Sequence, residues 1–104
     1  MTYQPLTKER EDQLAKTLGN VTRNADFNIL KAILEHGRQQ EDGTYQITTN
    51  DIAEAARCDK HTVYKRVRIM QNTGYLKRIA DDRRKVRFED RDKEQPGGIY
   101  QVLV

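Results

Sequence analysis

The chain has 104 residues, of which 36% are hydrophobic and 34% charged, and its formal net charge is only +3. This length fits one domain with a single modest core. No apolar run approaches the roughly 20 residues of a membrane span, and the first twelve residues lack the character of a signal or transit peptide. A lone cysteine, Cys58, cannot form an internal disulfide. Together these features predict an intracellular, cytoplasmic protein with no membrane partner.

The residues that usually carry catalysis are scarce. The chain has two histidines, one cysteine and no glycine-rich phosphate loop, and its carboxylates lie in surface-like runs such as Asp81 and Asp82. Cys58 and His61 have a metal-like spacing, but a structural zinc site needs four ligands and no second pair exists, because His36 is far away in sequence. We therefore expect no enzyme activity, no cofactor and no metal.

An N-terminal helix is expected from about Lys8 to Leu18, with Thr7 as its N-cap and a stop at residues 19–20. Its apolar stripe is thin, because it consists mainly of Leu14, Ala15 and Leu18. Such a stripe does not bury a helix deeply. The helix therefore docks either on the edge of its own domain or on a second copy of the chain, in a homodimer.

The strongest helical pattern runs from Asn24 to His36, where apolar residues mark a continuous face and Gly37 ends the helix. We expect this helix to be the first of a three-helix core. Residues 38–44 form a polar turn, and residues 45–47 are typical of a short strand. The predicted partners of that strand are Leu76 and the C-terminal strand.

The segment from Thr48 to Ile79 is the most informative part of the chain. The hydroxyl of Thr48 can cap a helix while Asp51, three residues on, reaches back in a capping box, so a short helix is expected over residues 49–56. Only residues 57–59 follow before the next helix. Asp59 is a good cap for that helix, which is expected to begin at Lys60.

This second helix has two different faces. Val63, Val67 and Met70 fall on one apolar stripe. The residues on the other side are polar, basic or aromatic: His61, Tyr64, Lys65 and Arg68. Gly74 stands where a left-handed C-terminal cap is expected, and residues 75–79 then alternate as a strand.

The C-terminal part of the chain is predicted to be a hairpin with a long irregular connection. Residues 80–85 contain three consecutive cations, residues 86–88 alternate as a strand, and residues 89–98 are polar. The β-rich run of residues 99–104 is expected to pair antiparallel with residues 75–79.

This order of elements resembles the winged helix-turn-helix superfamily of DNA-binding domains over about Ala25 to Val104. Residues 48–53 stand where that family has its capped second helix, residues 62–67 where it has the recognition helix, and residues 74–78 where the chain leaves toward the wing. Many members have glycine in the turn where this chain has Arg57, and a left-handed residue other than glycine is mildly costly.

The resemblance implies a fold that is mainly α with a small antiparallel β-sheet, of the α+β class. Residues 1–22 would be an N-terminal extension with an additional helix, and residues 23–104 the winged helix-turn-helix domain. The same fold also serves as a protein-interaction module, so function requires a separate argument.

The distribution of charge supplies that argument. Residues 1–56 contain six Lys or Arg and nine Asp or Glu, whereas residues 57–91 contain twelve and five, a net charge of +7. The basic segment coincides with the expected recognition helix and wing. This coincidence is typical of phosphate binding, although a charge run alone is more often a solvated surface.

The resemblance also assigns roles to residues. With the recognition helix, residues 60–73, in the major groove, its N-terminal turns reach deepest. The base-reading residues would be Lys60, His61, Tyr64 and Lys65. The backbone contacts from the helix would be Thr62, Arg66 and Arg68. The basic wing, residues 80–98, would meet the backbone or minor groove through Arg83, Arg84, Lys85 and Arg87.

Alternatives remain for several of these residues. Arg66 lies nearer the packed stripe, so it reaches a phosphate or pairs with an acid. Tyr64 contacts either the groove or the wing, and His61 is either solvated or a DNA contact. Cys58 is interpreted as a small apolar plug at the turn. Ile69 falls on the exposed side, which indicates contact with the wing or a partner.

The sequence therefore predicts a sequence-specific double-stranded DNA-binding protein, most simply a small transcriptional regulator. Two alternatives are a replication or partition factor of a mobile element and a winged-helix module that binds an acidic protein. No pocket for a small-molecule effector is evident. The expected partners are duplex DNA and, through the N-terminal helix, a second copy of the chain.

Overall fold

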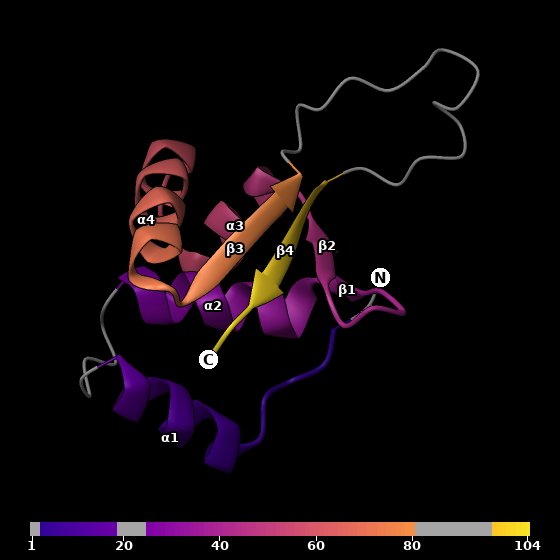
Figure 1. Cartoon of the computed structure of the whole chain (residues 1–104), viewed down its shortest axis with the longest axis vertical. Coiled ribbons are helices and arrows are strands. Elements are labelled where there is room, and N and C mark those ends of the chain that lie inside the picture. The colour runs from indigo at the N-terminus through magenta and orange to yellow at the C-terminus, as the bar shows by residue number, and fades with distance from the viewer. Residues whose placement is uncertain (1–2, 19–24, 81–96) are drawn as a thin grey trace.

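Four helices and a four-stranded antiparallel sheet make up the described part of the chain, residues 3–18, 25–80 and 97–104 of the computed structural model (Figure 1). The helices are α1 (Lys8–Thr17), α2 (Ala25–His36), α3 (Thr49–Ala56) and α4 (Lys60–Thr73). The strands are β1 (Arg38–Gln39), β2 (Tyr45–Ile47), β3 (Leu76–Ala80) and β4 (Gly98–Val102). The expected α+β class with an antiparallel sheet is confirmed.

Side-chain caps fix where the helices begin. Thr7, Thr48 and Asp59 each accept a hydrogen bond from the backbone N–H three residues further on, at the start of α1, α3 and α4. These bonds satisfy amides that a helix leaves without a partner at its first turn. Gly74 ends α4 with φ 85°, in the left-handed region that glycine adopts without strain. The predicted caps of these three helices are thus confirmed.

The turn between α3 and α4 is built with Arg57 in the left-handed conformation, at φ 57° and ψ 47°. Among the described residues other than glycine, it is the one with a positive φ. The backbone N–H of Cys58 donates to the carbonyl of Ala53 at 3.0 Å, which closes the end of α3. The chain therefore keeps a tight turn without the glycine, at a backbone cost of about 1–2 kcal/mol.

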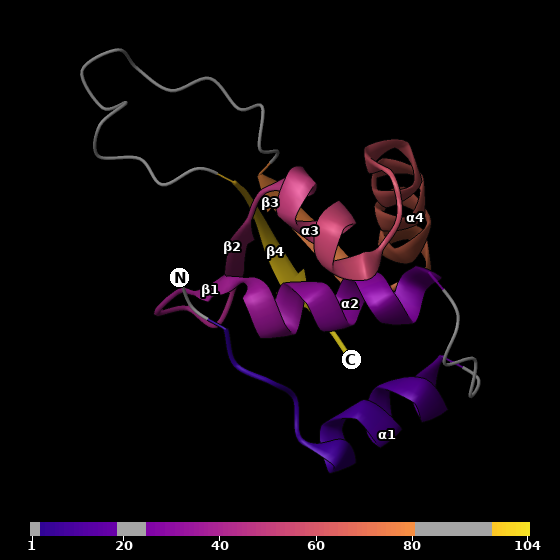
Figure 2. The ribbon, with the colours of Figure 1, turned by 180° about the vertical axis from the view of Figure 1, so that it is seen from behind.

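The main core lies between the sheet and helices α2, α3 and α4, which all lie on one side of the sheet (Figures 1 and 2). Its most buried side chains come from every one of these layers. They include Ile29, Leu30, Ile33, Ile52, Val63, Val67, Met70, Leu76 and Tyr100. The expected three-helix core is confirmed, and it holds α4 with one face inward.

Helix α1 packs on α2 through its thin apolar stripe, and the rest of the helix is exposed or partly exposed, as expected. Leu14 is fully buried and Ala15 nearly so, in a second cluster with Phe27 and Leu34 of α2. The sequence stripe is short, but α2 offers apolar residues on this side as well as toward the main core. Of the two expected docking positions, α1 takes the one on its own chain.

The sheet corrects two expectations. The segment of residues 38–44 is not only a turn, because it begins with β1, which pairs with β2 in a hairpin closed by Gly43 at φ 86°. Leu76 is not a partner of β2: the strand order is β1-β2-β4-β3, so β2 pairs with β4, and Leu76 lies opposite Val102. Two polar residues that pair through backbone alone leave no apolar alternation to detect.

The antiparallel pairing of β3 with β4 is confirmed, with a register shift between Arg78 and Ala80. Strand β2 has the expected bounds, whereas β3 and β4 begin and end one to two residues away from the expected positions. None of the helices in the described ranges has the length and apolar character that a membrane crossing requires.

Candidate nucleic-acid interface

Helix α4 buries one face and exposes the other. Val63, Val67 and Met70 lie in the core with at most 1% of their surface exposed. The exposed residues of its first turns and outer face are mainly basic: Lys60, His61, Lys65 and Arg68. The helix has no acidic residue along its length. The predicted division into a packed stripe and a basic face is confirmed.

The basic face borders a groove of about 680 Å³ between α4 and β3. The described residues that line it are His61, Tyr64, Lys65, Arg68, Ile69 and Arg78. Four of them are predicted DNA contacts, and none carries a carboxylate. The fold thus gathers cationic side chains from a helix and from a strand around one concave surface, which is favourable for an anion.

Tyr64 is half-buried and faces Arg78 of β3. The Cζ atom of Arg78 lies 6.0 Å from the centre of the Tyr64 ring, within reach of a cation–π interaction. The backbone N–H of Arg78 also donates to Oε1 of Gln71 on α4, at 3.2 Å. Of the two alternatives for Tyr64, contact with the strand that leads to the expected wing is present in this structure.

Arg78 was not predicted as a site residue. The alternation of residues 75–79 indicates a strand, but the face on which each side chain lies depends on how that strand pairs. Leu76 is buried, so Arg78, two residues on, lies on the same side of β3 and faces α4. Lys77, between them, is exposed.

Arg66 pairs with an acid, which is one of the two alternatives that the sequence left open for it. Its Nε and Nη2 atoms donate to the two carboxylate oxygens of Asp26, each at 2.6 Å. The Asp26 side chain is only 8% exposed, and that of Arg66 31%. This hydrogen-bonded partner raises the pKa of Arg66 above its usual value. The contact ties α4 to the first turn of α2, and a phosphate contact by Arg66 stays a prediction.

Thr62 lies at the first turn of α4 against the Asp59 cap. Its N–H donates to Oδ1 of Asp59 at 2.6 Å. Hydrogen bonds from the backbone and side chain of Thr62 hold the pKa of the Asp59 carboxyl below its usual value. These contacts fix where α4 begins. Contact of Thr62 with a phosphate stays a prediction.

Cys58 is partly buried and packs against the main core, which confirms its interpretation as a small plug in the turn. Burial raises the pKa of its thiol. Within residues 3–18, 25–80 and 97–104, no group of three or more His, Cys, Asp and Glu side chains could hold a metal ion. The predicted wing contacts Arg83, Arg84, Lys85 and Arg87 lie outside the described residues.

A known relative could explain the role of helix α4, its basic face and the groove. Protein-family models, curated proteins and solved structures give no match to this chain. Function therefore has to be argued from the site.

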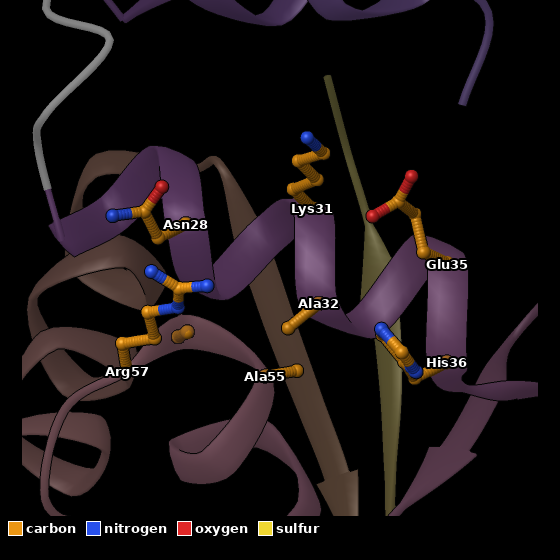
Figure 3. Close-up of a pocket in the computed structure, with 8 residues that line it drawn as sticks. Asn28, Lys31, Ala32, Glu35, His36, Ala55 and Arg57 are labelled. Carbon is orange, nitrogen blue, oxygen red and sulfur yellow. The ribbon is translucent and has the colours of Figure 1, made fainter. Parts of the chain in front are cut away.

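A second groove, of about 470 Å³, lies between α2 and α3 (Figure 3). Its floor is made of alanines, and Lys31 and Glu35 point away from them. The Lys31 Nζ atom forms an ion pair with Glu11 at 2.7 Å, and the Glu35 carboxylate accepts the N–H of Leu6 at 2.8 Å. The charges of this groove are mixed and two of them hold the N-terminal segment, so we do not assign it a ligand.

Proposed function

We propose that this protein binds double-stranded DNA sequence-specifically as a winged helix-turn-helix domain, most simply as a small transcriptional regulator. In this proposal α3 and α4 are the helix-turn-helix, and α4 enters the major groove. The observation that supports it most directly is the groove between α4 and β3, whose described lining residues include Lys65, Arg68 and Arg78 and no carboxylate. An α-helix with an exposed basic face is the shape and charge that a major groove admits.

The local geometry supports the same orientation. The exposed side chains of Lys60, His61 and Lys65 lie on the first two turns of α4, which reach deepest when a recognition helix enters the groove. Arg68 lies further along the helix, where the groove wall rises, and contacts the backbone. The Asp59 cap and the contact between Arg66 and Asp26 hold the helix in a fixed position on the core.

Selection from a pool of random duplexes tests this proposal. We expect the wild type to enrich a defined sequence, and Lys65→Ala to change the enriched sequence, because it removes a base-edge contact. Lys16→Ala is the matched control, since Lys16 is an exposed cation on α1, away from the groove. A wild-type protein that enriches no sequence would contradict sequence-specific binding.

The alternatives make different predictions. A replication or partition factor of a mobile element would use the same interface, and the selected sequence would then map to an origin or partition site rather than to promoters. A protein-interaction module would bind an acidic protein through the groove and would enrich no duplex.

A homodimer through α1 stays a prediction. Because Leu14 and Ala15 already pack against α2, such a dimer has to use the exposed side chains of α1. The mass of the protein in solution, measured with and without the selected duplex, decides between one copy and two on the DNA.

A further inference from the structure

The groove between α4 and β3 is lined by a cation, Arg78, that comes from the sheet rather than from the helix. Arg78 is half-buried, and its backbone N–H donates to the Gln71 side chain of α4. This bond fixes the strand relative to the helix at that point. The side chain of Arg78 therefore leaves the backbone at a defined place beside the basic face of α4.

The ring of Tyr64 further restricts the guanidinium. It lies 6.0 Å from Cζ of Arg78, a geometry in which the ring attracts the cation. Both side chains are half-buried, unlike the exposed Lys65 and Arg68. A tyrosine that is packed against a strand in this way is less able to extend to a base edge than the exposed residues beside it.

The surroundings of Arg78 favour an anion. Lys65 and Arg68 line the same groove, and none of its lining residues within the described part of the chain carries a carboxylate. Cationic side chains that gather at one concave surface give it a positive potential, which attracts an anion. The planar guanidinium matches a phosphate through two parallel hydrogen bonds, which a lysine ammonium does not.

We infer that Arg78 holds a phosphate of the DNA backbone in the groove between α4 and β3, and that Tyr64 is a positioning residue for this guanidinium rather than a base-reading residue. This inference rests on the proposed function. It extends the proposed function by assigning one side of the interface to the sheet. The sugar–phosphate backbone of one DNA strand then lies between α4 and β3.

The test uses the full chain and a panel of duplexes that differ in sequence, with affinity measured at several salt concentrations. Arg78→Gln removes the charge but keeps a polar side chain of similar reach. We expect it to weaken binding by about 3-fold to 10-fold on every duplex, to leave their order unchanged, and to reduce the salt slope by about 1. Lys77→Ala, on the exposed side of the same strand, should keep the wild-type slope.

The positioning role of Tyr64 is tested by combining its variants with Arg78→Gln. Tyr64→Phe keeps the ring and should bind as the wild type does, whereas Tyr64→Ala should weaken all duplexes alike. Combined with Arg78→Gln, Tyr64→Ala should add no further loss, because the two residues act as a unit. Thermal melting confirms that each variant folds. If Arg78→Gln does not fold, Arg78→Lys is used, which should keep the slope while losing affinity.

The outcomes separate this inference from the proposed function. Wild-type protein that binds no duplex at low salt overturns both. If the wild type binds but Arg78→Gln keeps its full salt slope, Arg78 does not hold a phosphate. If Tyr64→Phe or Tyr64→Ala changes the order of the duplexes, Tyr64 reads bases and its positioning role is wrong.

Discussion

Asp26 and Arg66 join α2 to α4 across forty positions of sequence, through two parallel hydrogen bonds. The Asp26 carboxylate is nearly buried, so its desolvation is costly, and the two hydrogen bonds from Arg66 help to offset that cost. Removing Arg66 leaves the Asp26 carboxylate without these bonds in a place that water reaches poorly, whereas removing Asp26 leaves a guanidinium that is 31% exposed. The pair therefore fixes the position of α4 only when both residues are present.

We expect Asp26→Ala to lower the free energy of unfolding by about 1–3 kcal/mol, because it removes two charge-assisted hydrogen bonds that join α2 to α4. Urea denaturation measures the change. Glu41→Ala is the control, since Glu41 is an exposed acid in the turn after β1, and it should change the stability by less than about 0.5 kcal/mol. Equal stabilities of the two variants would contradict the structural role of the pair.

The left-handed Arg57 allows a substitution that should stabilise the protein. Arg57→Gly removes the steric cost of a positive φ, and the added freedom of glycine in the unfolded chain offsets part of this gain. We expect a net gain of about 0.5–1 kcal/mol in the free energy of unfolding. Ala55→Gly, two residues earlier within α3, should instead cost about 1 kcal/mol. A loss of stability in Arg57→Gly would show that the arginine makes a compensating contact.

The sequence predicts single residues well where the cause is local. The caps Thr7, Thr48 and Asp59 depend on a side chain three residues from the amide that it satisfies, so the pattern is visible in the chain itself. Asp26 and Arg78 depend on which segments meet in space. A carboxylate in the first turn of a helix is explained equally well by the helix dipole, so the partner of Arg66 had no signal of its own.

Among the elements, the start of α4 depends on the Asp59 cap, whose charge is sensitive to pH. Hydrogen bonds from Thr62 lower the pKa of Asp59 in the folded protein below the value of about 3.8 expected for an unfolded chain. The ionised cap therefore stabilises the fold at pH values above about 3.8. That stabilisation is lost as the pH falls through the lowered pKa of the folded state.

Comparison with Asp59→Asn isolates this charge, because asparagine is also a good cap but does not titrate. We expect the wild type to be the more stable of the two at pH 6, and the difference to decrease steadily as the pH falls below about 4. Urea denaturation at a series of pH values measures it, and the titration of every other carboxyl is common to both proteins. A difference that does not change with pH would exclude the charged cap as its source.

Helix α1 depends on one fully buried side chain. We expect Leu14→Ala to cost about 2–4 kcal/mol of the free energy of unfolding, because it leaves a cavity against Phe27 and Leu34 of α2. Leu103→Ala is the matched control, since Leu103 is 49% exposed. If both variants have wild-type stability, α1 contributes little to the fold and is available for another partner.

The order of the elements could be predicted more completely than the pairing of the strands. Helical periodicity and caps placed all four described helices within about one residue of their ends. The strands were harder to predict. Strand β1 has only two residues, both polar, and the partner of β2 depends on the order of the strands in the sheet. Periodicity identifies which residues can form an element, whereas the sheet order depends on contacts between distant segments.

For the whole molecule, the fold brings together one basic surface, which neither the net charge of +3 nor the elements alone would produce. The exposed face of α4 was predictable from its period, and so were four of the six described residues that line the groove. Arg78 entered the site only because β3 packs beside α4. The predicted wing lies outside the described residues, and its contacts stay predictions.

The dependence of duplex binding on salt tests the central claim most directly. If about five phosphates are contacted, the logarithm of the association constant should fall with the logarithm of the salt concentration with a slope of about −4.5, and Arg68→Ala, which removes one backbone contact, should have a slope shallower by about 1. Lys16→Ala should match the wild type. A flat salt response, or no binding to any duplex at low salt, would contradict DNA binding through α4.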